Sequence, residues 1–539
     1  MTEGPQGEET VWSLLATAAA YHPTRPALND GHEVLTYAEL MRHVDEVARG
    51  LAALGLRQGD RVGLATGNRN ETIFLYYALA RIGAVTVWLS TRWSSEEFIG
   101  ATERTEVRYL VVEPVVRHNS IADTLSAAVP EIAGSTFGAL RSARLPELRG
   151  VISVGGRLEG AVPWIAIRER GASGRSITPA PVAPTDVAMM VFTSGSTAFP
   201  RAAMLTHGGI ARNARAHSAR LRVTEEDRWC TAMPFFHVGG TVWGLGTCAA
   251  RGACLVYLPV FDPERMLDAI GRYRCTVQFG VETMIRDELA LPTFDRHDLS
   301  SLRLSAAGAP TELRREVRER FGVPTILSMY GMTEAHGNVA VTGPDDTIEQ
   351  QDTTMGRPHA DVRVEIADPE TDGPLPAGME GEIVLSGRGL FAGYYGDAAA
   401  TRAVLGDDGR LHSGDLGVLD GDGHLTFRAR LKEMIRVGGE NVSLAEVERI
   451  VMAHPAIERA YAVGVPHDRL VETVAVFARR HDGAEVSADE LRAYCASRLA
   501  QYKVPTHVFF VQELPLGSSG RVSKAQLRDD ALRRLRSAS

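Results

Sequence analysis

One loop gathers the hydroxyl and glycine residues that suit phosphate oxygens. The stretch VFTSGSTAFPRAAMLTH covers Val191 to His207, and its apolar lead-in, Val187 to Phe192, predicts a strand. The loop after this strand contains Thr193, Ser194, Gly195, Ser196 and Thr197. Hydroxyls and free backbone N–H groups at this density favour phosphate binding, with a helix beginning after Met204. A Ser/Thr-rich turn before a helix is the alternative, because the lysine of a P-loop is absent.

A carboxylate follows a second apolar strand. The motif YGMTEAHG, Tyr330 to Gly337, comes directly after the predicted strand Thr325 to Met329. Glu334 beside Thr333 at the carboxyl end of a strand is well placed to hold Mg²⁺ on a nucleotide. A capped turn is the alternative, because Thr and Glu are common in such turns.

Three further motifs follow towards the C-terminus. HSGDLG, His412 to Gly417, carries Asp415, whose carboxylate can accept both hydroxyls of a ribose. RARLKEMIRVGGENVSLAEVE, Arg428 to Glu448, predicts a basic strand, a Gly-Gly turn and an amphipathic helix. PLGSSGRVSK, Pro515 to Lys524, is a glycine- and serine-rich loop that ends in basic residues.

The elements around these motifs alternate between helix and apolar strand. The first series is predicted as helix Glu39–Leu54, strand Arg61–Ala65, helix Glu71–Ile82, strand Ala84–Leu89, helix Ser95–Thr102 and strand Tyr109–Glu113. A second series runs from Val187 to about Tyr330, after a Gly-, Ser- and Pro-rich stretch, Gly155 to Pro184, that is typical of a surface connection. This alternation predicts βαβ units and parallel sheets covered on both faces. From Arg357, short strands between turn clusters indicate a β unit, and about Lys432 to Ser539 indicates a small α+β domain.

Composition excludes several classes of protein. The 539 residues carry 58 − 67 = −9 formal charges, which argues against a nucleic-acid partner. Five cysteines without a CxxC pair argue against a disulfide framework or a zinc site. The acidic start MTEGPQGEET lacks the regions of a signal peptide, and the most apolar stretch, Ile73 to Ala80, stops at Arg81. We therefore predict a cytoplasmic protein without a membrane partner.

Taken in this order, the motifs resemble those of the adenylate-forming superfamily of acyl-CoA synthetases, adenylation domains and luciferases. The resemblance extends to Arg61–Leu89 and to LFAGYYGD, Leu390 to Asp397, and the wording GGENVSLAEVE is most similar to acyl-CoA ligases. It implies an α/β fold: a large N-terminal domain, 1–431, of two βαβ-type sheet lobes plus a β unit, and a small mobile α+β C-terminal domain, 432–539.

The resemblance implies a nucleotide site. In it, Thr193 to Thr197 and Arg201 bind phosphates, Tyr330 stacks on adenine, Thr333 contacts the α-phosphate and Glu334 binds Mg²⁺. Further implied nucleotide contacts are Gly308, Ala309 and Pro310 beside the adenine, and Asp415 and Arg430 at the ribose.

The resemblance also implies an acyl site and a moving lid. His237 in PFFHVGG matches the mouth of the acyl pocket. Lys432 matches the hinge of the small domain, and Gly438 and Gly439 match a turn that enters the site beside the pantetheine of coenzyme A in the second half-reaction. The implied cofactors are ATP and Mg²⁺, with CoA as a co-substrate, and the expected assembly is a monomer or a homodimer.

This sequence departs from the family pattern at three positions. Ala198 replaces a glycine of the phosphate loop, Arg201 replaces its lysine, and Arg521 stands where the family has its adenylation lysine. Only three of the 58 basic residues are lysines, namely Lys432, Lys503 and Lys524. Arginine and lysine are not interchangeable at a crowded phosphate, so either Arg521 is the catalytic cation, or Lys524 replaces it, or the reaction has changed.

Three activities therefore stand as hypotheses. The first is activation of a small or medium acid, aromatic acids included, as acyl-AMP, with transfer to CoA and release of AMP and pyrophosphate. The second is a repurposed enzyme, such as a diazotase that joins nitrite to an aromatic amine or an enzyme that acylates a carrier protein or amine. Arg521 and the polar pocket candidates Glu282, His336 and Asn338 motivate it, although Glu282 is also explained as an exposed charge. The third is a degenerate nucleotide-binding protein.

Overall fold

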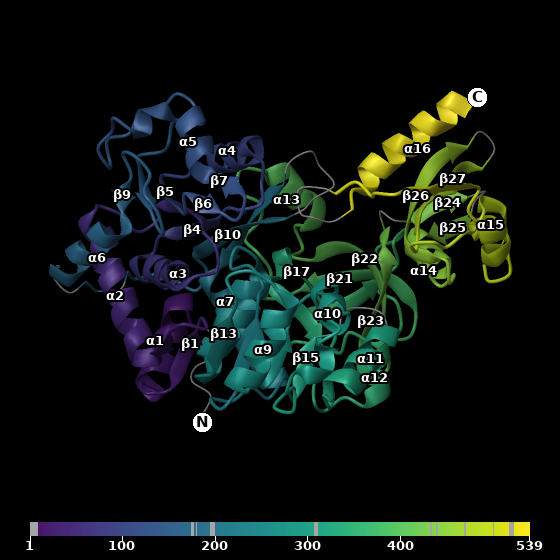
Figure 1. The fold of residues 1–539 in the computed structure, drawn as a ribbon, viewed down its shortest axis with the longest axis horizontal. Coiled ribbons are helices and arrows are strands. Elements are labelled where there is room, and N and C mark those ends of the chain that lie inside the picture. The colour runs from purple at the N-terminus through teal and green to yellow at the C-terminus, as the bar shows by residue number, and fades with distance from the viewer. Residues whose placement is uncertain are drawn as a thin grey trace. The chain divides into compact units, whose positions relative to one another are not determined.

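The computed structural model describes residues 9–173, 177–178, 180–193, 200–306, 311–431, 434–437, 440–467, 470–499, 501–516 and 522–538 (Figure 1). The chain divides into two compact units. The first comprises residues 1–365, 384–412 and 419–426, and the second comprises residues 366–383, 413–418 and 427–539. Each unit is described by itself below.

One sheet of the first unit carries the strand that leads into the predicted phosphate loop. Its order is β11-β10-β4-β3-β5-β8-β9. These strands are β11 (Arg201–Thr206), β10 (Val187–Thr193), β4 (Val85–Trp88), β3 (Arg61–Ala65), β5 (Tyr109–Val112), β8 (Gly150–Ser153) and β9 (Val162–Pro163). All neighbouring pairs are parallel except β10 with β11. Its central strands are apolar because helices cover them: Val87 and Leu110 pack in one core with Phe98 of α4 (Ser95–Arg104).

A second sheet of the same unit has the order β16-β15-β14-β12-β13-β1-β2. These strands are β16 (Thr325–Leu327), β15 (Leu304–Ala306), β14 (Val277–Phe279), β12 (Arg228–Thr231), β13 (Cys254–Tyr257), β1 (Pro26–Asn29) and β2 (Val34–Thr36). Helices α9 (Pro263–Tyr273) and α11 (Thr311–Phe321) lie along this sheet (Figure 1). Their apolar faces, including Ile270 and Val317, pack with Cys230 and Val256 of the strands. The two sheets are parallel except for the edge pairs β10–β11 and β1–β2, and they confirm the α/β fold class.

Helices between and beside the sheets complete the first unit. They are α1 (Val11–Tyr21), α2 (Tyr37–Ala53), α3 (Asn70–Ile82), α5 (Ile121–Ala128), α6 (Trp164–Ser173), α7 (His207–Arg220), α8 (Thr247–Arg251), α10 (Glu282–Leu289), α12 (Ile348–Thr353) and α13 (Ala398–Val404), with the π-helical segment η2 (Gly239–Gly246). The local sequence determines where such helices begin. At the start of α2, the Thr36 side chain accepts the backbone N–H of Glu39, and the Glu39 side chain accepts the backbone N–H of Thr36, which is a capping box. Among the described residues, no helix is long and apolar enough to cross a membrane.

Two smaller sheets follow the parallel ones. A three-stranded sheet contains β17 (Met329–Met332), β18 (Gly337–Val341) and β19 (Arg357–Pro358). A four-stranded sheet contains, in order, β20 (Arg363–Ala367), β21 (Glu380–Ser386), β22 (Leu411–Leu419) and β23 (Leu425–Arg430). These strands confirm the β unit that the turn-rich sequence after Arg357 predicts.

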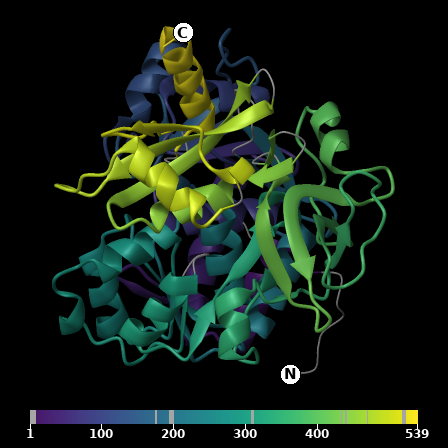
Figure 2. The same ribbon diagram turned by 90° about the vertical axis from the view of Figure 1, so that its right-hand side faces the viewer.

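The second unit contains a five-stranded sheet, seen from a further side in Figure 2 with the C-terminal helix in yellow. Its strands are β25 (Glu440–Ser443), β24 (Met434–Val437), β27 (Val471–Arg480), β26 (Ile457–His467) and β28 (His507–Phe510), and its helices are α14 (Leu444–Met452), α15 (Ala488–Ala496) and α16 (Lys524–Ala538). Val447 of α14 and Leu491 of α15 share a core with Val474 and Val476 of the sheet. This α+β composition agrees with the sequence.

Two local elements were not predicted. The helix expected after Met204 is α7, which begins at His207, but Arg201–Thr206 before it forms strand β11 against β10. The stretch Gly155–Pro184 is not only a connection, since it contains α6, which packs on α2. Both elements depend on a partner distant in sequence, which local propensity does not report.

The contact between α2 and α6 generates a stability prediction. A Cβ placed on Gly171 of α6 would lie 1.9 Å from the carbonyl oxygen of Glu46 on α2. Gly171→Ala should therefore lower the free energy of unfolding by about 1–3 kcal/mol, although alanine favours helix by itself. Urea unfolding followed by circular dichroism measures this, with Gly134→Ala as the control because nothing lies within 4 Å of its added Cβ. Equal stability of the two variants would show that the helices separate at no cost.

Candidate active site

The turn between β17 and β18 presents the predicted metal carboxylate. The two strands pair antiparallel, with Tyr330 opposite Ala340 and Met332 opposite Gly337. Thr333, Glu334 and Ala335 form a single 3-10 turn, η4, between them. Glu334 is only 9% exposed and Thr333 is half-buried. The hairpin therefore holds Thr333 and Glu334 side by side, as the sequence predicts.

His336 fixes this turn to two other segments. Its backbone adopts the left-handed conformation, with φ 61°, which turns the ring inward. The ring Nε2 accepts a hydrogen bond of 2.9 Å from the backbone N–H of Thr206, so Nδ1 carries the proton and donates to the carbonyl of Gly389 at 3.0 Å. Burial lowers the pKa of His336 to about 4, which keeps the ring neutral. His336 is therefore a structural clamp, and its ring nitrogens are both occupied.

The segment after Gly389 lies along β11 and reaches the turn. Ala392 donates its backbone N–H to Met204, and Met204 donates back to Gly393, each at 2.9 Å. Gly393 has φ 104°, a conformation that favours glycine, and Tyr394 follows it. The Tyr394 hydroxyl donates to Oε1 of Glu334 at 2.5 Å, and the backbone N–H of Phe391 donates to the Glu334 carbonyl at 2.8 Å. Tyr394 thereby orients the carboxylate.

Charged groups surround Tyr394. The Arg201 guanidinium lies 5.6 Å from the centre of the tyrosine ring, and its Nε is 3.6 Å from Oδ2 of Asp397. Burial, followed by the neighbouring Glu334 carboxylate, raises the pKa of Tyr394, so the hydroxyl stays a proton donor. Thr193 pairs with Arg201 across the hairpin of β10 and β11. Thr193, Arg201 and Glu334 are therefore joined through Tyr394 and the strands beside it.

The donor set of Glu334 fits Mg²⁺ held on a nucleotide. Tyr394 occupies Oε1, and the described residues provide no partner for Oε2. Magnesium is commonly bound by one or two carboxylates plus substrate phosphates and water. Among the described residues no group of three or more His, Cys, Asp or Glu side chains could hold a metal on its own. A single carboxylate that relies on phosphate oxygens matches this arrangement.

Two other predicted residues lie in the first unit. Tyr330 is on β17 and is 6% exposed. His237 is half-buried at the start of η2, where its Nδ1 accepts the backbone N–H of Gly239 at 3.0 Å. Its ring meets the Trp243 indole edge-on, with the ring centres 6.5 Å apart. His237 therefore lies just before the π-helical segment that carries Trp243.

Three predicted residues lie in the second unit. Asp415 and Arg430 are together, since Nε of Arg430 is 3.5 Å from Oδ1 of Asp415. The Ser413 hydroxyl oxygen accepts a hydrogen bond of 3.1 Å from the backbone N–H of Asp415. Lys524, at the start of α16, forms an ion pair of 2.9 Å with Glu448 on α14. Asp415 and Arg430, which are predicted to hold the ribose, are thus in contact with each other, whereas the ammonium group of Lys524 is paired with Glu448.

Several predicted residues lie outside the described part of the chain. They are Ser194, Gly195, Ser196, Thr197, Gly308, Ala309, Pro310, Lys432, Gly438, Gly439 and Arg521. Glu282, by contrast, lies at the start of α10 and pairs with Arg286 at 2.9 Å. This ion pair accounts for Glu282 as a surface charge.

The sequence did not single out Tyr394 or Asp397 as site residues. Both lie in LFAGYYGD, a segment that belongs to the family resemblance but for which no role was predicted. The Gly-Tyr pair in this segment was the one feature of the sequence that could have indicated a site residue. The contact of Tyr394 with Glu334 joins residues 60 apart in the chain, so spacing alone does not reveal it.

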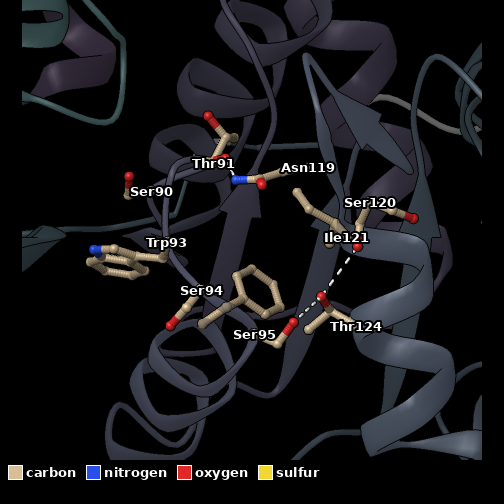
Figure 3. A pocket seen from close by; sticks show the side chains of 10 residues that line it. Ser90, Thr91, Trp93, Ser94, Ser95, Asn119, Ser120, Ile121 and Thr124 are labelled. Atoms are coloured by element: carbon tan, nitrogen blue, oxygen red, sulfur yellow. Dashed lines mark hydrogen bonds between the residues drawn. The ribbon is translucent and has the colours of Figure 1, made fainter. Parts of the chain in front are cut away.

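A separate cavity of about 200 Å³ lies elsewhere in the first unit, between the first turns of α4 and α5 (Figure 3). Ser95 and Thr124 face each other there through a hydrogen bond of 2.8 Å, and Asn119 donates to the Thr91 carbonyl at 2.7 Å. None of the residues that line it is a predicted site residue. We assign it no role.

Comparison with known protein families covers nearly the whole chain. Residues 15–395 match the family described as AMP-binding enzyme, and residues 446–521 match the AMP-binding enzyme C-terminal domain. The first match contains the Glu334 turn, Arg201 and Tyr394, and the second ends at Arg521.

Individual relatives agree. YngI of Bacillus subtilis is 34% identical over 536 residues, with 97% of each chain covered. The mitochondrial medium-chain acyl-CoA ligase ACSF2 of Bos taurus is 31% identical, with 97% of this chain and 87% of ACSF2 covered. The structure of o-succinylbenzoate CoA synthetase (MenE) of Bacillus subtilis, in complex with its acyl-adenylate intermediate, is 27% identical, has a TM-score of 0.80 and covers 97% of this chain and 98% of MenE.

The hydrogen bond between Tyr394 and Glu334 generates a prediction. Among the described residues, the Tyr394 hydroxyl is the only side-chain donor to the Glu334 carboxylate, and Tyr394→Phe removes it. Because a hydrogen bond to a charged group contributes about 1.5–3 kcal/mol, this variant should need about tenfold more Mg²⁺ for half-maximal ATP binding. Calorimetric ATP titrations at increasing Mg²⁺ measure this. The control is Tyr395→Phe, which removes a neighbouring hydroxyl that bonds Glu106 instead. The same Mg²⁺ dependence in both variants would exclude a positioning role for Tyr394.

Proposed function

Since the chain belongs to the AMP-binding enzyme family, we propose that it uses ATP to activate a carboxylic acid as acyl-AMP and transfers the acyl group to CoA. The observation that carries the proposal is the oriented carboxylate of Glu334, held beside Thr333 and bonded by Tyr394. The acyl-CoA ligase ACSF2 and the CoA synthetase MenE are related along nearly all of this chain, which supports CoA as the acceptor over nitrite chemistry.

The proposed first step forms an anhydride. A carboxylate oxygen of the acid attacks the α-phosphorus of ATP, the new bond joins that oxygen to phosphorus, and pyrophosphate leaves with the electron pair of the broken P–O bond. Thr333 donates its hydroxyl towards the α-phosphate, and Arg201 offers positive charge beside the phosphate loop. When bound at Glu334, Mg²⁺ supplies charge neutralisation at the phosphate oxygens. Fixed donors of this kind act on the charge that develops in the transition state.

The proposed second step consumes the anhydride. The thiol of CoA loses its proton and attacks the acyl carbonyl, a thioester bond forms, and AMP leaves. We propose residues 432–539 as the part that moves between the two steps, with Lys432 at the hinge and Gly438 and Gly439 at the thiol. Movement of such a lid keeps water from the reactive acyl-AMP.

We propose Arg521 as the cation of the adenylation step. The alternative cation, Lys524, is supported less well because its ammonium group already pairs with Glu448 at 2.9 Å. The ribose contacts are assigned to Asp415 and Arg430, which lie 3.5 Å apart, and the adenine contacts to Gly308, Ala309, Pro310 and Tyr330. His237 is assigned to the mouth of the acyl pocket.

The activity is tested directly with product detection. The enzyme is incubated with ATP, Mg²⁺ and a panel of aliphatic and aromatic acids, with and without CoA, and AMP, pyrophosphate and thioester are measured. We expect pyrophosphate release that depends on the acid, and thioester only when CoA is present. Pyrophosphate without a thioester for any acid would contradict transfer to CoA, and AMP formation only with nitrite and an aryl amine would contradict acid activation.

The charge at position 521 provides a second test. Arg521→Lys restores a compact ammonium group and should preserve or raise the rate of acid-dependent pyrophosphate release, whereas Arg521→Ala should lower it by about 10²–10³-fold, as removal of one transition-state donor does. Lys524→Ala is the matched control and should change this rate far less. Loss of activity in Arg521→Lys would instead mean that the reaction requires the guanidinium group itself.

A further inference from the structure

A buried cluster of ring nitrogens lies beside the Glu334 turn. It is called the ring-nitrogen cluster below and consists of His217 on α7, Trp229 on β12, Trp243 in η2 and His359 after β19, with the amides of Asn213 on α7 and Asn338 on β18. His217, Trp229 and Asn338 are fully buried. Every member belongs to the first unit.

His217 is the centre of this cluster. Its ring centre lies 5.8 Å from that of Trp229, 6.5 Å from that of Trp243 and 6.2 Å from that of His359. The Asn338 amide nitrogen donates to Nδ1 of His217 at 2.8 Å, so the ring proton is on Nε2. Burial lowers the pKa of His217 to about 3, and the ring is neutral. Nε2–H and the two indole N–H groups are therefore hydrogen-bond donors.

These donors have no acceptor in the described part of the chain. Within the described residues, Nε2 of His217, Nε1 of Trp229 and Nε1 of Trp243 are buried without a hydrogen-bond partner. The same holds for Nε2 of His359 and for Oδ1 of Asn338 and Asn213. Each unpaired buried group has lost its hydrogen bonds to water without gaining a partner, which destabilises the folded chain. Native proteins bury few such groups, and a set of them around one ring indicates a place where an external acceptor binds.

The cluster is attached to the turn that carries Glu334. The Trp243 indole packs on the backbone of Gly337, so closely that an added Cβ there would lie 2.4 Å from Nε1. The Asn213 amide donates to the carbonyls of Ala335 and Asn338, at 3.4 and 2.6 Å. On its other side, Trp243 meets the ring of His237. The donors thus lie beside the turn that carries Glu334, proposed for Mg²⁺, and beside His237, proposed for the mouth of the acyl pocket.

We infer that the ring-nitrogen cluster binds a neutral oxygen group on the acid substrate, so that the enzyme selects acids bearing a hydroxyl or carbonyl oxygen remote from the carboxylate. This inference rests on the proposed function, because it assigns the substrate class of the same site. His217 Nε2–H and Trp243 Nε1–H donate to that oxygen, and Oδ1 of Asn338 accepts a hydroxyl proton.

Charge explains why the bound group is neutral. Arg220, whose charge acts on His359, is itself paired with Asp346 at 2.6 Å. The cluster therefore offers dipoles without a free charge, and a second carboxylate or an ammonium group would lose its hydration there without compensation. A hydroxyl or carbonyl oxygen loses less hydration free energy on burial, and it accepts hydrogen bonds from the unpaired donors.

Matched pairs of acids test the inference. They are benzoate with its para-hydroxy derivative, and hexanoate and octanoate with their terminal hydroxy and keto derivatives. The ratio of kcat/KM for pyrophosphate release, oxygenated over parent acid, is measured in each pair. We expect at least one ratio of about tenfold or more in the wild type, because sites built to bind a hydroxyl discriminate strongly against its absence.

Variants separate recognition from packing. Trp243→Phe and His217→Leu remove one donor each and should lower the kcat/KM ratio by about tenfold. His217→Gln retains an N–H near the position of Nε2 and should therefore lower this ratio less than His217→Leu does. Trp88→Phe is the control. It removes a buried indole N–H that bonds Met189 in the other large sheet, and it should keep the wild-type ratio. Melting temperatures report packing losses, which leave the ratio unchanged.

The outcomes distinguish the inference from the proposed function. If acids release pyrophosphate but no oxygenated member is favoured, or if the Trp243 and His217 variants change both members of a pair equally, the inference is overturned and the function stands. If no acid releases pyrophosphate, the proposed function fails and the inference fails with it.

Discussion

The two hydrogen bonds of the His336 ring are the constraint on which the site depends. Nε2 of the ring accepts a hydrogen bond from the backbone N–H of Thr206, and Nδ1 donates one to the carbonyl of Gly389. This one buried side chain therefore joins the start of α7, the Glu334 turn and the segment that contains Tyr394. Protonation or loss of the ring would release all three. A Cβ on Gly209 would come 2.2 Å from Nε2 of this ring, which explains the glycine in the first turn of α7.

Two kinds of polar group lie around His336: an oriented carboxylate and a set of neutral N–H groups. On one side, Tyr394 keeps its proton and bonds Oε1 of Glu334, the carboxylate that we propose for Mg²⁺ on the nucleotide. On the other side, the ring nitrogens His217 Nε2 and Trp243 Nε1 are buried and have no hydrogen-bond partner among the described residues. The same short hairpin therefore contacts both the proposed phosphate site and the proposed recognition site for the acid, so a shift of the turn would disturb both.

Local patterns identified the elements but not the long-range contacts. The helix predicted at Glu39–Leu54 is α2, because its apolar spacing and its capping box at Thr36 are local signals. Strand β11 was missed because Ala, Met and Leu favour helix, and only pairing with β10 makes Arg201–Thr206 extended. The motif YGMTEAHG predicts Glu334 as a metal ligand, whereas the contact of Glu334 with Tyr394 depends on tertiary structure. The resemblance supplied roles that spacing alone left open.

The central claim is that a carboxylate attacks the α-phosphorus of ATP at the Glu334 turn, and oxygen transfer tests it most directly. An acid that supports turnover is labelled with ¹⁸O in its carboxylate, and the AMP formed in the presence of CoA is analysed by mass spectrometry. Attack at the α-phosphorus places one labelled oxygen in each AMP, because the anhydride oxygen stays with phosphorus when the thiol displaces AMP. Unlabelled AMP would contradict the account, since it would show that water, not the acid, attacks the nucleotide.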